Sequence, residues 1–311
     1  MHTGQCLRHS RRCASGATGL NQRQSKAITA APLAIIAGNG RLPLQIAESV
    51  NARSQPVFIV GIRGEADRGI EQFPHEWCGW EQVGRIFKSI KQNNITNVVL
   101  AGGIIGRPEF RLHKLDWGTI RTLPGLLAAL LGGDNQILTG VISVLEKRGF
   151  TVCNVAEILP EMTVLEGANT STKPKAAQKK QIAEGYAVAQ AMGQFDIGQA
   201  CVVVGSRAVA VEAVEGTDAM LARVAEMRRV GRLPKKPGGV LVKAVKPGQD
   251  ERADLPAIGP ETISLVHEAG LLGIGVEANK TLIIDKVQTL KLANDLGVFI
   301  FGFDGTALER P

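Results

Sequence analysis

The chain has 311 residues, 44% of them hydrophobic and 21% charged, which is the composition of a globular protein long enough for two hydrophobic cores. Its formal net charge is +7, but residues 1–30 carry five of these excess charges and no acidic residue. Aromatic residues make up only 4% of the chain and do not alternate with basic ones, which argues against nucleic-acid binding. No apolar run approaches the roughly 18 to 20 residues of a membrane span, so we expect a soluble intracellular protein.

Residues 1–31 form a basic extension that we expect to be disordered and to lie outside the fold. The segment is rich in Ser, Thr, Gly and Arg and has no apolar core of a secretory signal. It is similar in composition to an organellar transit peptide, and it fits equally well a disordered arm or a start codon assigned too far upstream. The five cysteines are odd in number and form no C-x-x-C pair, which indicates free thiols in a reducing compartment.

An alternation of strands and helices starts at Pro32 and predicts an N-terminal α/β domain over residues 32–165. The expected strands are Leu33–Ala37, Pro56–Gly61, Asn97–Ala101 and Phe150–Val155, with one helix that follows the first strand and another bounded by Asp134 and Gly149. Strands that alternate with helices pair in parallel. We therefore expect a Rossmann-like sheet whose ligand crevice lies at the carboxyl ends of its strands.

Two glycine-rich turns lie at this edge of the predicted sheet. The first reads AGNGRLP over Ala37–Pro43, and the second is the glycine pair after the strand that ends at Ala101. Such turns permit positive φ and bring backbone N–H groups to a helix N-terminus, where an anion is favoured. A tight turn without a ligand explains them equally well, since neither is a Walker A loop or a full G-x-G-x-x-G motif. The candidate substrate-binding residues here are Gly38, Asn39, Gly40, Arg41, Leu42, Gly102 and Gly103.

A second, mixed-sheet α/β domain is predicted over residues 166–311. A polar, lysine-rich segment at Asn169–Lys180 marks a linker or exposed loop near the boundary. The Gly205-Ser206 pair then predicts a hairpin turn, so antiparallel pairing begins there. The expected strands are Ala200–Val204, Arg207–Val214, Val240–Val245, Gly273–Glu277, Thr281–Asp285 and Val298–Phe303, with helices that begin near Thr217, at Pro260 and at Lys286.

Two segments of this domain carry candidate chemistry. In EGTDAML (Glu215–Leu221), Thr217 or Asp218 can cap a helix, or the two side chains can face a phosphate and its metal. In Arg252–Gly259, Asp254 stands before Leu-Pro on a stiff loop of the kind that positions catalytic groups, although Asp is also a common turn residue. No pair of histidines has the spacing of metal ligands.

Four ordered motifs, AGNGRLP, DIGQ (Asp196–Gln199), EGTDAML and RxDLPxIG (Arg252–Gly259), together resemble the bacterial UDP-2,3-diacylglucosamine pyrophosphatases of the non-metallophosphoesterase type. The resemblance covers residues 32–311. It implies two α/β domains with a lipid nucleotide between them. It also implies metal-dependent hydrolysis of UDP-2,3-diacylglucosamine to UMP and 2,3-diacylglucosamine 1-phosphate (lipid X), in the lipid A biosynthesis of Gram-negative bacteria.

The same resemblance implies roles for particular residues. The family's essential aspartate falls on Asp254, which with Asp218 is a candidate ligand of Mg²⁺ or Mn²⁺, or which alternatively orients the attacking water. Gln199, Thr217 and Lys243 complete the candidate substrate-binding set. The family's first loop usually reads A-G-G-G, so Asn39 is a departure, and Asn tolerates positive φ better than other non-glycine residues.

The implied substrate carries two acyl chains, so the resemblance places the protein in the cytoplasm, in transient contact with the inner-membrane surface. A homodimer is implied by the resemblance only. Glu212 and Glu215 lie on opposite faces of the predicted hairpin strand, so at most one of them is expected to share the site.

Two other classes of function stay open on sequence alone. A nucleotide-binding oxidoreductase fits the β-α-β units, but it needs an acidic residue at the end of the second strand, where none occurs before Glu65. A non-catalytic nucleotide-sugar binding protein differs from the hydrolase only in turnover. Titration with dinucleotides distinguishes the first class, and an assay for released UMP distinguishes the second.

Overall fold

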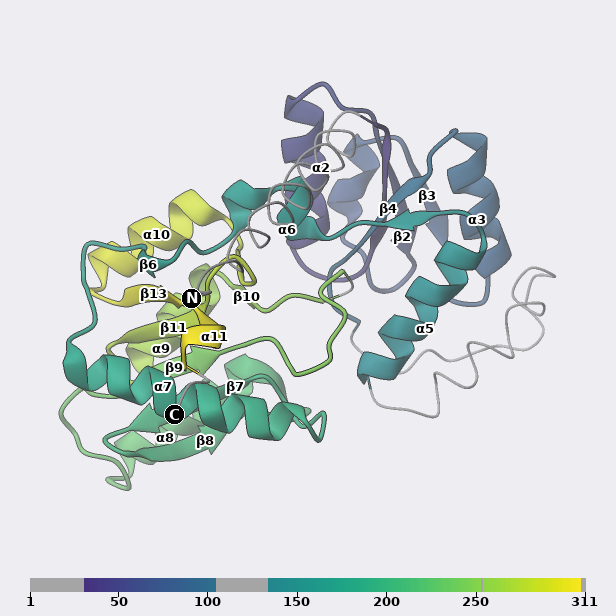
Figure 1. The fold of residues 1–311 in the computed structure, drawn as a ribbon. Helices are drawn as coiled ribbons and strands as arrows, with labels where there is room; N and C mark the ends of the chain where they lie inside the picture. The colour runs from purple at the N-terminus through teal and green to yellow at the C-terminus, as the bar shows by residue number, and fades with distance from the viewer. Residues whose placement is uncertain (1–30, 105–133, 253, 309–311) are drawn as a thin grey trace, which may run out of the picture.

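The computed structural model describes residues 31–104, 134–252 and 254–308, which build two α/β domains (Figure 1). Residues 1–30 of the basic extension, the apolar run at residues 126–131 and His113 lie outside the described residues. The first sheet is built from residues before Cys153, and the second from residues after Gln199. The predicted two-domain α/β architecture is therefore confirmed.

The N-terminal sheet consists of five parallel strands, as the alternation of strands and helices predicts. The strands β1 (Leu33–Ala37), β2 (Val57–Ile62), β3 (His75–Cys78), β4 (Asn97–Ala101) and β5 (Thr151–Val152) pair in the order β3-β2-β1-β4-β5. This is a Rossmann-like order, in which the chain reverses its direction of winding between β1 and β4, so that a crevice opens at the carboxyl ends of these two strands.

Helices cover both faces of this sheet and bury two apolar clusters. The helical segments are α2 (Leu42–Ala52), α3 (Val83–Gln92), α5 (Asp134–Lys147) and α6 (Val155–Ile158), with 3-10 turns η1 (Arg68–Gln72) and η3 (Pro160–Met162). Ile46 and Val50 of α2 pack on one face with Ile35, whereas Ile90 of α3 and Leu145 of α5 pack on the other. Every residue of β2 is buried, as expected for a strand covered on both faces.

Two elements of the first domain differ from the sequence expectation. The expected strand Phe150–Val155 ends after Val152, and the chain turns into α6 because Asn154 caps this short helix by accepting a hydrogen bond from Ala156 N at 2.8 Å. The strand β3 (HEWC) was not predicted, since it has one fully buried residue and no alternating apolar pattern. It pairs with β2 at the edge of the sheet.

The C-terminal sheet is mixed and has the order β13-β11-β9-β7-β8. Its strands are β7 (Ala200–Val204), β8 (Arg207–Val211), β9 (Val240–Lys243), β11 (Gly273–Glu277) and β13 (Phe299–Phe303), and two short strands β10 (Ala257–Ile258) and β12 (Leu282–Ile283) pair separately. The strand β6 (Gly167–Ala168) precedes them. The predicted hairpin is confirmed: β7 and β8 are antiparallel and Gly205 has φ +66° at the turn, although β8 ends three residues before the expected Val214.

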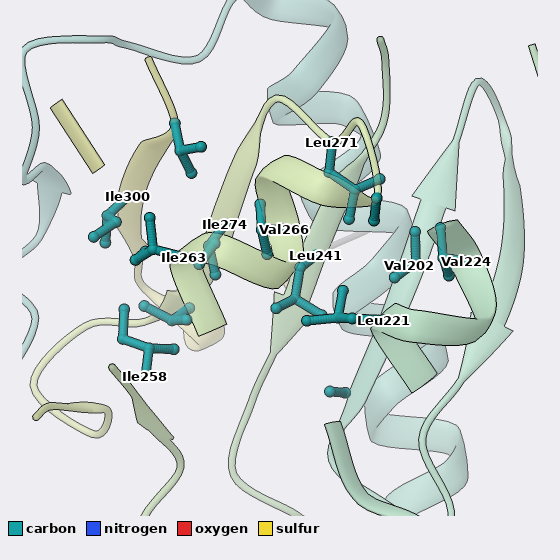
Figure 2. Packing of buried hydrophobic residues seen from close by; sticks show 14 of the residues in the cluster. Val202, Leu221, Val224, Leu241, Ile258, Ile263, Val266, Leu271, Ile274 and Ile300 are labelled. Carbon is teal, nitrogen blue, oxygen red and sulfur yellow. The ribbon is translucent and has the colours of Figure 1, made fainter. Parts of the chain in front are cut away.

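The helices of this domain are α7 (Ala176–Gly193), α8 (Gly216–Arg229), α9 (Pro260–Glu268), α10 (Lys286–Asp295) and α11 (Gly305–Leu308). Figure 2 shows the main core, in which Leu241 of the central strand meets Leu221 of α8 and Val266 of α9. On the opposite face, α7 packs Ile182 and Tyr186 against β7 and β9. Burial on both faces holds the carboxyl end of β9 in place, and that end leads directly into the segment of Asp254.

The two domains pack together through residues that flank this segment. Leu255 and Leu282, which follow the linker, belong to the apolar cluster of the first domain rather than to the core of their own. Gln45 of α2 donates a hydrogen bond to Asp285 Oδ1 at 2.8 Å across the same boundary. Apolar packing and polar contacts thus fix where the Asp254 segment lies relative to the first sheet.

Candidate active site

The two glycine-rich turns of the first domain are joined to each other. Asn39 N donates to Gly103 O at 2.7 Å, and Gly103 N donates back to Asn39 O at 2.9 Å. Gly102 adopts φ +90°, and a Cβ on Gly38 would collide with the carbonyl oxygen of Gly103. These glycines are therefore required for the turns to approach one another.

This pairing changes which groups of the turns are available to a ligand. The N–H groups of Gly38, Asn39 and Gly103 all donate to backbone carbonyls, so the expected anion cradle does not include them in this conformation. Gly40, with φ +94°, and the half-exposed side chain of Arg41 stand at the open end of the turn. Arg41 lies 3.4 Å from Glu48 and 3.7 Å from Asp285, so its charge is already balanced in part.

A cavity of about 260 Å³ separates the glycine turns from the Asp254 segment. Gly40, Arg41 and Gly102 line it from the first domain, and Asp254 and Leu255 line it from the second. Ligand pockets are usually about 300–1,000 Å³, so this cavity lies just below the usual size range. The cavity brings together the two groups of residues that the sequence singled out separately.

Asp254 is half-buried and accepts a hydrogen bond on Oδ2 from Gln249 Nε2 at 2.8 Å. Burial raises the pKa of its carboxyl, and nearby Glu212 raises it further, whereas Lys243, Lys246 and the Gln249 hydrogen bond act in the opposite direction. The net pKa lies above the ordinary aspartate value. A carboxyl group that is poorly hydrated and surrounded by charges at a cavity wall has the properties of a catalytic group.

The segment that carries Asp254 is held by contacts from four directions. Val245 N donates to the buried carboxylate Glu277 at 2.8 Å, and Lys246 forms an ion pair with Asp196 at 2.6 Å. Lys280 binds Glu251 at 2.8 Å. These contacts come from β11, the loop after α7 and the loop after β11, so the segment is fixed along its length.

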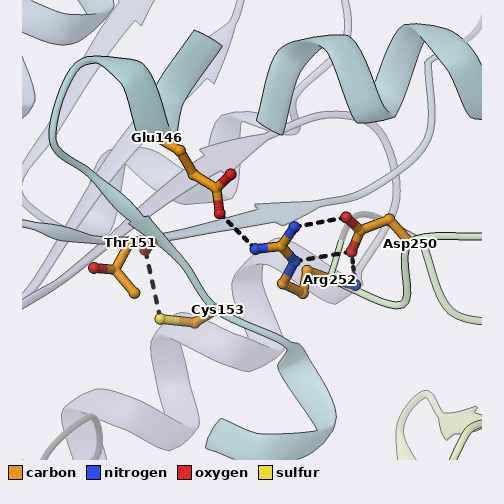
Figure 3. Close-up of polar contacts among 5 residues, drawn as sticks. All are labelled: Glu146, Thr151, Cys153, Asp250 and Arg252. Atoms are coloured by element: carbon orange, nitrogen blue, oxygen red, sulfur yellow. Dashed lines mark hydrogen bonds and ion pairs between the residues drawn. The ribbon is translucent and has the colours of Figure 1, made fainter. Parts of the chain in front are cut away.

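The fourth contact joins this segment to the first domain (Figure 3). Arg252 donates to Asp250 through Nε at 2.9 Å and Nη2 at 2.7 Å, and Nη1 donates to Glu146 of α5 at 2.6 Å. Both carboxylates raise the pKa of Arg252 above its usual value, and Arg252 lowers the pKa of Asp250. Cys153, a buried thiol beside this contact, donates to Thr151 O at 3.6 Å. Arg252 thus links the position of α5 to that of the Asp254 segment.

Lys243, Thr217 and Glu212 form a hydrogen-bonded row at the carboxyl edge of the second sheet. Lys243 Nζ donates to Thr217 Oγ1 at 3.0 Å, and Thr217 Oγ1 donates to Glu212 Oε1 at 2.5 Å. Glu212 Oε2 accepts from the backbone N–H of Gln199 at 3.1 Å. Lys243, Thr217 and the backbone of Gln199, which belong to the candidate substrate-binding set, are therefore brought together. The side-chain oxygen of Gln199 is buried and has no hydrogen-bond donor in the described part of the chain.

Asp218, one of the two predicted metal ligands, lies in the first turn of α8 with its side chain exposed. No contact joins it to Asp254 among the described residues, and these residues contain no group of three or more His, Cys, Asp or Glu side chains arranged to hold a metal ion. Asp254 fits Mg²⁺ only if oxygens of the substrate complete the coordination of the ion, because Mg²⁺ is commonly held by one or two carboxylates plus phosphate oxygens.

Several residues that build the site were not selected from the sequence. Glu212 was considered only as one of two glutamates on opposite faces of a strand, and the structure buries it while Glu215 pairs with Arg223 at the start of α8. Gln249 and Glu277 carried no signal at all. Each acts through a hydrogen-bond partner that it meets only in the folded chain, so no local sequence pattern identifies it.

Within the described ranges, no helix combines the length and the apolar character that crossing a bilayer requires.

Comparisons with known proteins cover both domains. Residues 32–162 match the LpxI N-terminal domain family, and residues 165–301 match the LpxI C-terminal domain family. The chain is 37% identical over 281 residues to the UDP-2,3-diacylglucosamine pyrophosphatase LpxI of Caulobacter vibrioides, an alignment that covers 90% of this chain and 99% of the relative. The similarity therefore extends over the cavity and over both of its walls.

Proposed function

Because this chain belongs to the LpxI family over both of its domains, we propose that it hydrolyses the pyrophosphate bond of UDP-2,3-diacylglucosamine in lipid A biosynthesis. The products are UMP and 2,3-diacylglucosamine 1-phosphate. The observation that carries the proposal is the 37% identity over 99% of the relative. In support, Asp254, the carboxylate of the D-L-P motif, lines the cavity between the domains.

In the proposed reaction, a water molecule attacks one phosphorus atom of the pyrophosphate and the bridging P–O bond breaks. Asp254 orients this water and accepts its proton, a role that suits a carboxyl whose pKa is raised by burial. Lys243 provides positive charge for a phosphoryl oxygen. The glycine turns close the opposite wall of the cavity and keep the reacting group next to Asp254.

The reaction of a pyrophosphate usually requires a divalent cation, and we propose Mg²⁺ or Mn²⁺ held by the substrate oxygens and by Asp254, which in this alternative binds the ion instead of accepting the proton of the water. The ion would screen the negative charge of the pyrophosphate. Asp218 stays a second candidate ligand. Chelation with EDTA is expected to abolish turnover and added Mg²⁺ to restore it, with the circular dichroism spectrum unchanged throughout. Full turnover in EDTA would contradict this part of the proposal.

We further propose that the reaction needs no histidine-rich two-metal centre. Of the histidines in the described residues, His75 lies in β3 of the first domain and His267 in α9 of the second. The acyl chains of the proposed substrate imply transient contact with the cytoplasmic surface of the inner membrane, and the exposed side chains of Phe195 and Val214 are apolar groups suited to it. A homodimer stays an expectation that size-exclusion chromatography with light scattering tests.

The test is incubation with UDP-2,3-diacylglucosamine and Mg²⁺, followed by chromatographic detection of UMP. The wild-type chain is expected to release UMP and the sugar phosphate in equal amounts. Asp254→Ala is expected to lower kcat by several orders of magnitude while substrate binding survives, because the lost group acts on the transition state. A folded Asp254→Ala protein with near-normal kcat would remove Asp254 from its role, and absence of UMP from the wild type would refute the function itself.

A further inference from the structure

Lys243 is a buried cation in a rigid place. It is the last residue of the central strand β9, where it pairs with Ala200 of β7 and Val276 of β11, and it is only 8% exposed. A buried ammonium group needs hydrogen-bond acceptors to offset its loss of hydration. The Lys243 backbone cannot move the side chain towards other acceptors, because it is paired with a strand on each side.

The ammonium group has two acceptors among the described residues, Thr217 Oγ1 at 3.0 Å and Ala257 O at 3.2 Å. No carboxylate in the described part of the chain lies within 4.0 Å of it. An ammonium group has three N–H donors, so one remains for a ligand. Ala257, whose carbonyl accepts one of the two hydrogen bonds, lines the same cavity as Asp254, so the Lys243 ammonium lies next to the candidate site.

The hydroxyl of Thr217 is oriented by Glu212. An ionised carboxylate can only accept a hydrogen bond, so the 2.5 Å contact requires the Thr217 proton to point at Glu212 Oε1. The lone pairs of Thr217 Oγ1 are then free to accept from Lys243. Glu212 thereby determines the direction of the bond that holds the lysine.

Glu212 is itself fixed by the second domain. It is 7% exposed, its other oxygen accepts from Gln199 N at 3.1 Å, and its own N–H donates to Ala200 O at 2.8 Å. A Cβ on Gly198 would collide with the carbonyl of Glu212, so the glycine of the DIGQ motif permits this close approach. The positive N-terminus of α8, where Thr217 lies, favours the buried negative charge.

We propose that Glu212 and Thr217 are positioning residues that hold the Lys243 ammonium so that its third N–H donates to a phosphoryl oxygen of the substrate. They act through Lys243 and do not touch the substrate. In this arrangement the Thr217 hydroxyl accepts from the lysine and does not donate to phosphate. This inference rests on the proposed hydrolysis for its catalytic consequence, but the state of the lysine can be observed without turnover.

The test compares Thr217→Val, which removes the hydroxyl at constant shape, with Thr217→Ser, which keeps it. Thr217→Val is expected to lower kcat by about tenfold to a hundredfold with KM within about threefold, less than the factor of about 10² to 10³ for loss of a direct charge-stabilising donor. Thr217→Ser is expected to recover most of kcat. Glu212→Gln is expected to resemble Thr217→Val, since an amide cannot accept from both Thr217 and Gln199.

The control is Thr262→Val, which removes a buried hydroxyl from the adjacent helix α9 and is expected to leave kcat unchanged. Equal kcat values for the Val and Ser variants, in an enzyme that releases UMP, would overturn the inference and leave the proposed function intact.

A second measurement needs no substrate. In ¹⁵N-labelled protein the hydrogen-bonded Lys243 ammonium is expected to give a slowly exchanging NMR signal, assigned by its loss in Lys243→Met. This signal is expected to disappear in Thr217→Val and to persist in Thr217→Ser and Thr262→Val. Its persistence in Thr217→Val would refute the positioning role even if the wild-type chain hydrolysed nothing.

Discussion

At the scale of single residues, the environment of Asp254 opposes its ionised form. Burial is the largest influence on its carboxyl and raises its pKa, and the charges of Lys243 and Lys246 compensate only in part. A carboxylate without full hydration costs folding stability, which a surface aspartate would not. The catalytic role that we propose for Asp254 therefore comes at the expense of stability, a balance found where function and folding make opposite demands.

This balance predicts the behaviour of Asp254→Asn, which removes the charge at nearly constant shape. Because the folded pKa is raised, folding favours the protonated carboxyl, and ionisation destabilises the protein above the folded pKa. We expect Asp254→Asn to lose turnover and yet to melt at a higher temperature than wild type at pH 8. The difference should shrink as the pH falls through the folded pKa towards the unfolded value. A lower melting temperature at every pH between 4 and 8 would contradict this prediction.

At the scale of the secondary-structure elements, the two glycine turns act as one unit. Their reciprocal hydrogen bonds between Asn39 and Gly103 join the ends of β1 and β4, and no side chain takes part. The shape of this cavity wall thus depends on how closely two backbones approach. Substitutions that add a single methyl group should distinguish the glycines that permit this approach from those that do not.

Gly38→Ala and Gly103→Ala form a matched pair for this test. A methyl group on Gly38 would collide with the Gly103 carbonyl, so we expect a loss of stability of about 1–3 kcal/mol and a large loss of activity. A methyl group on Gly103 meets no atom within 4 Å, so its effect on stability should stay within about 0.5 kcal/mol. Urea denaturation and UMP release measure both effects. Equal effects from the two substitutions would show that the turns do not depend on close approach.

Much of the fold could be predicted from local pattern, because strands buried on both faces read as apolar runs between turn residues. The strand β1, the hairpin at Gly205 and the start of α10 at Lys286 follow the expectation. The edge strand β3 and the helix α6 do not, since packing and the Asn154 cap override their local composition. Asp254 and the glycine turns, which the sequence singled out separately, line one cavity in the structure, and their role at a site stays a prediction. The sequence did not predict the contacts of Glu212, Gln249 and Glu277, because these contacts form only when the chain folds.

At the scale of the whole molecule, Leu255 connects the Asp254 segment to the first domain by apolar packing. It directly follows Asp254, is 9% exposed, and packs in the cluster formed by β1, α2 and α6. Arg252 reinforces this link through Glu146 on α5. Arg252 and Leu255 thus both contact the domain to which the segment does not belong.

Leu255→Ala should therefore affect stability and catalysis together. Loss of a buried leucine costs about 2–5 kcal/mol, and here it also frees the backbone next to Asp254, so kcat is expected to fall as well. Leu271→Ala is the control, because Leu271 is also buried, in the second core, but precedes β11, at the end of that strand away from the site. This variant should lose similar stability and keep its kcat per folded molecule. Unchanged kcat in Leu255→Ala would show that the packing of Leu255 does not position Asp254.

The packing of Leu255 also limits how this enzyme can be recombined with its relatives. A chimera that exchanges one domain at the boundary near residue 165 would inherit Asp254 from one parent and the apolar residues around Leu255 from the other. Both halves could then fold correctly and still form an inactive protein. Activity should be recovered when the residues of β1, α2 and α6 that pack around Leu255 are also taken from the parent that supplies Leu255. The smallest segment that can be exchanged without loss of activity is therefore larger than one domain.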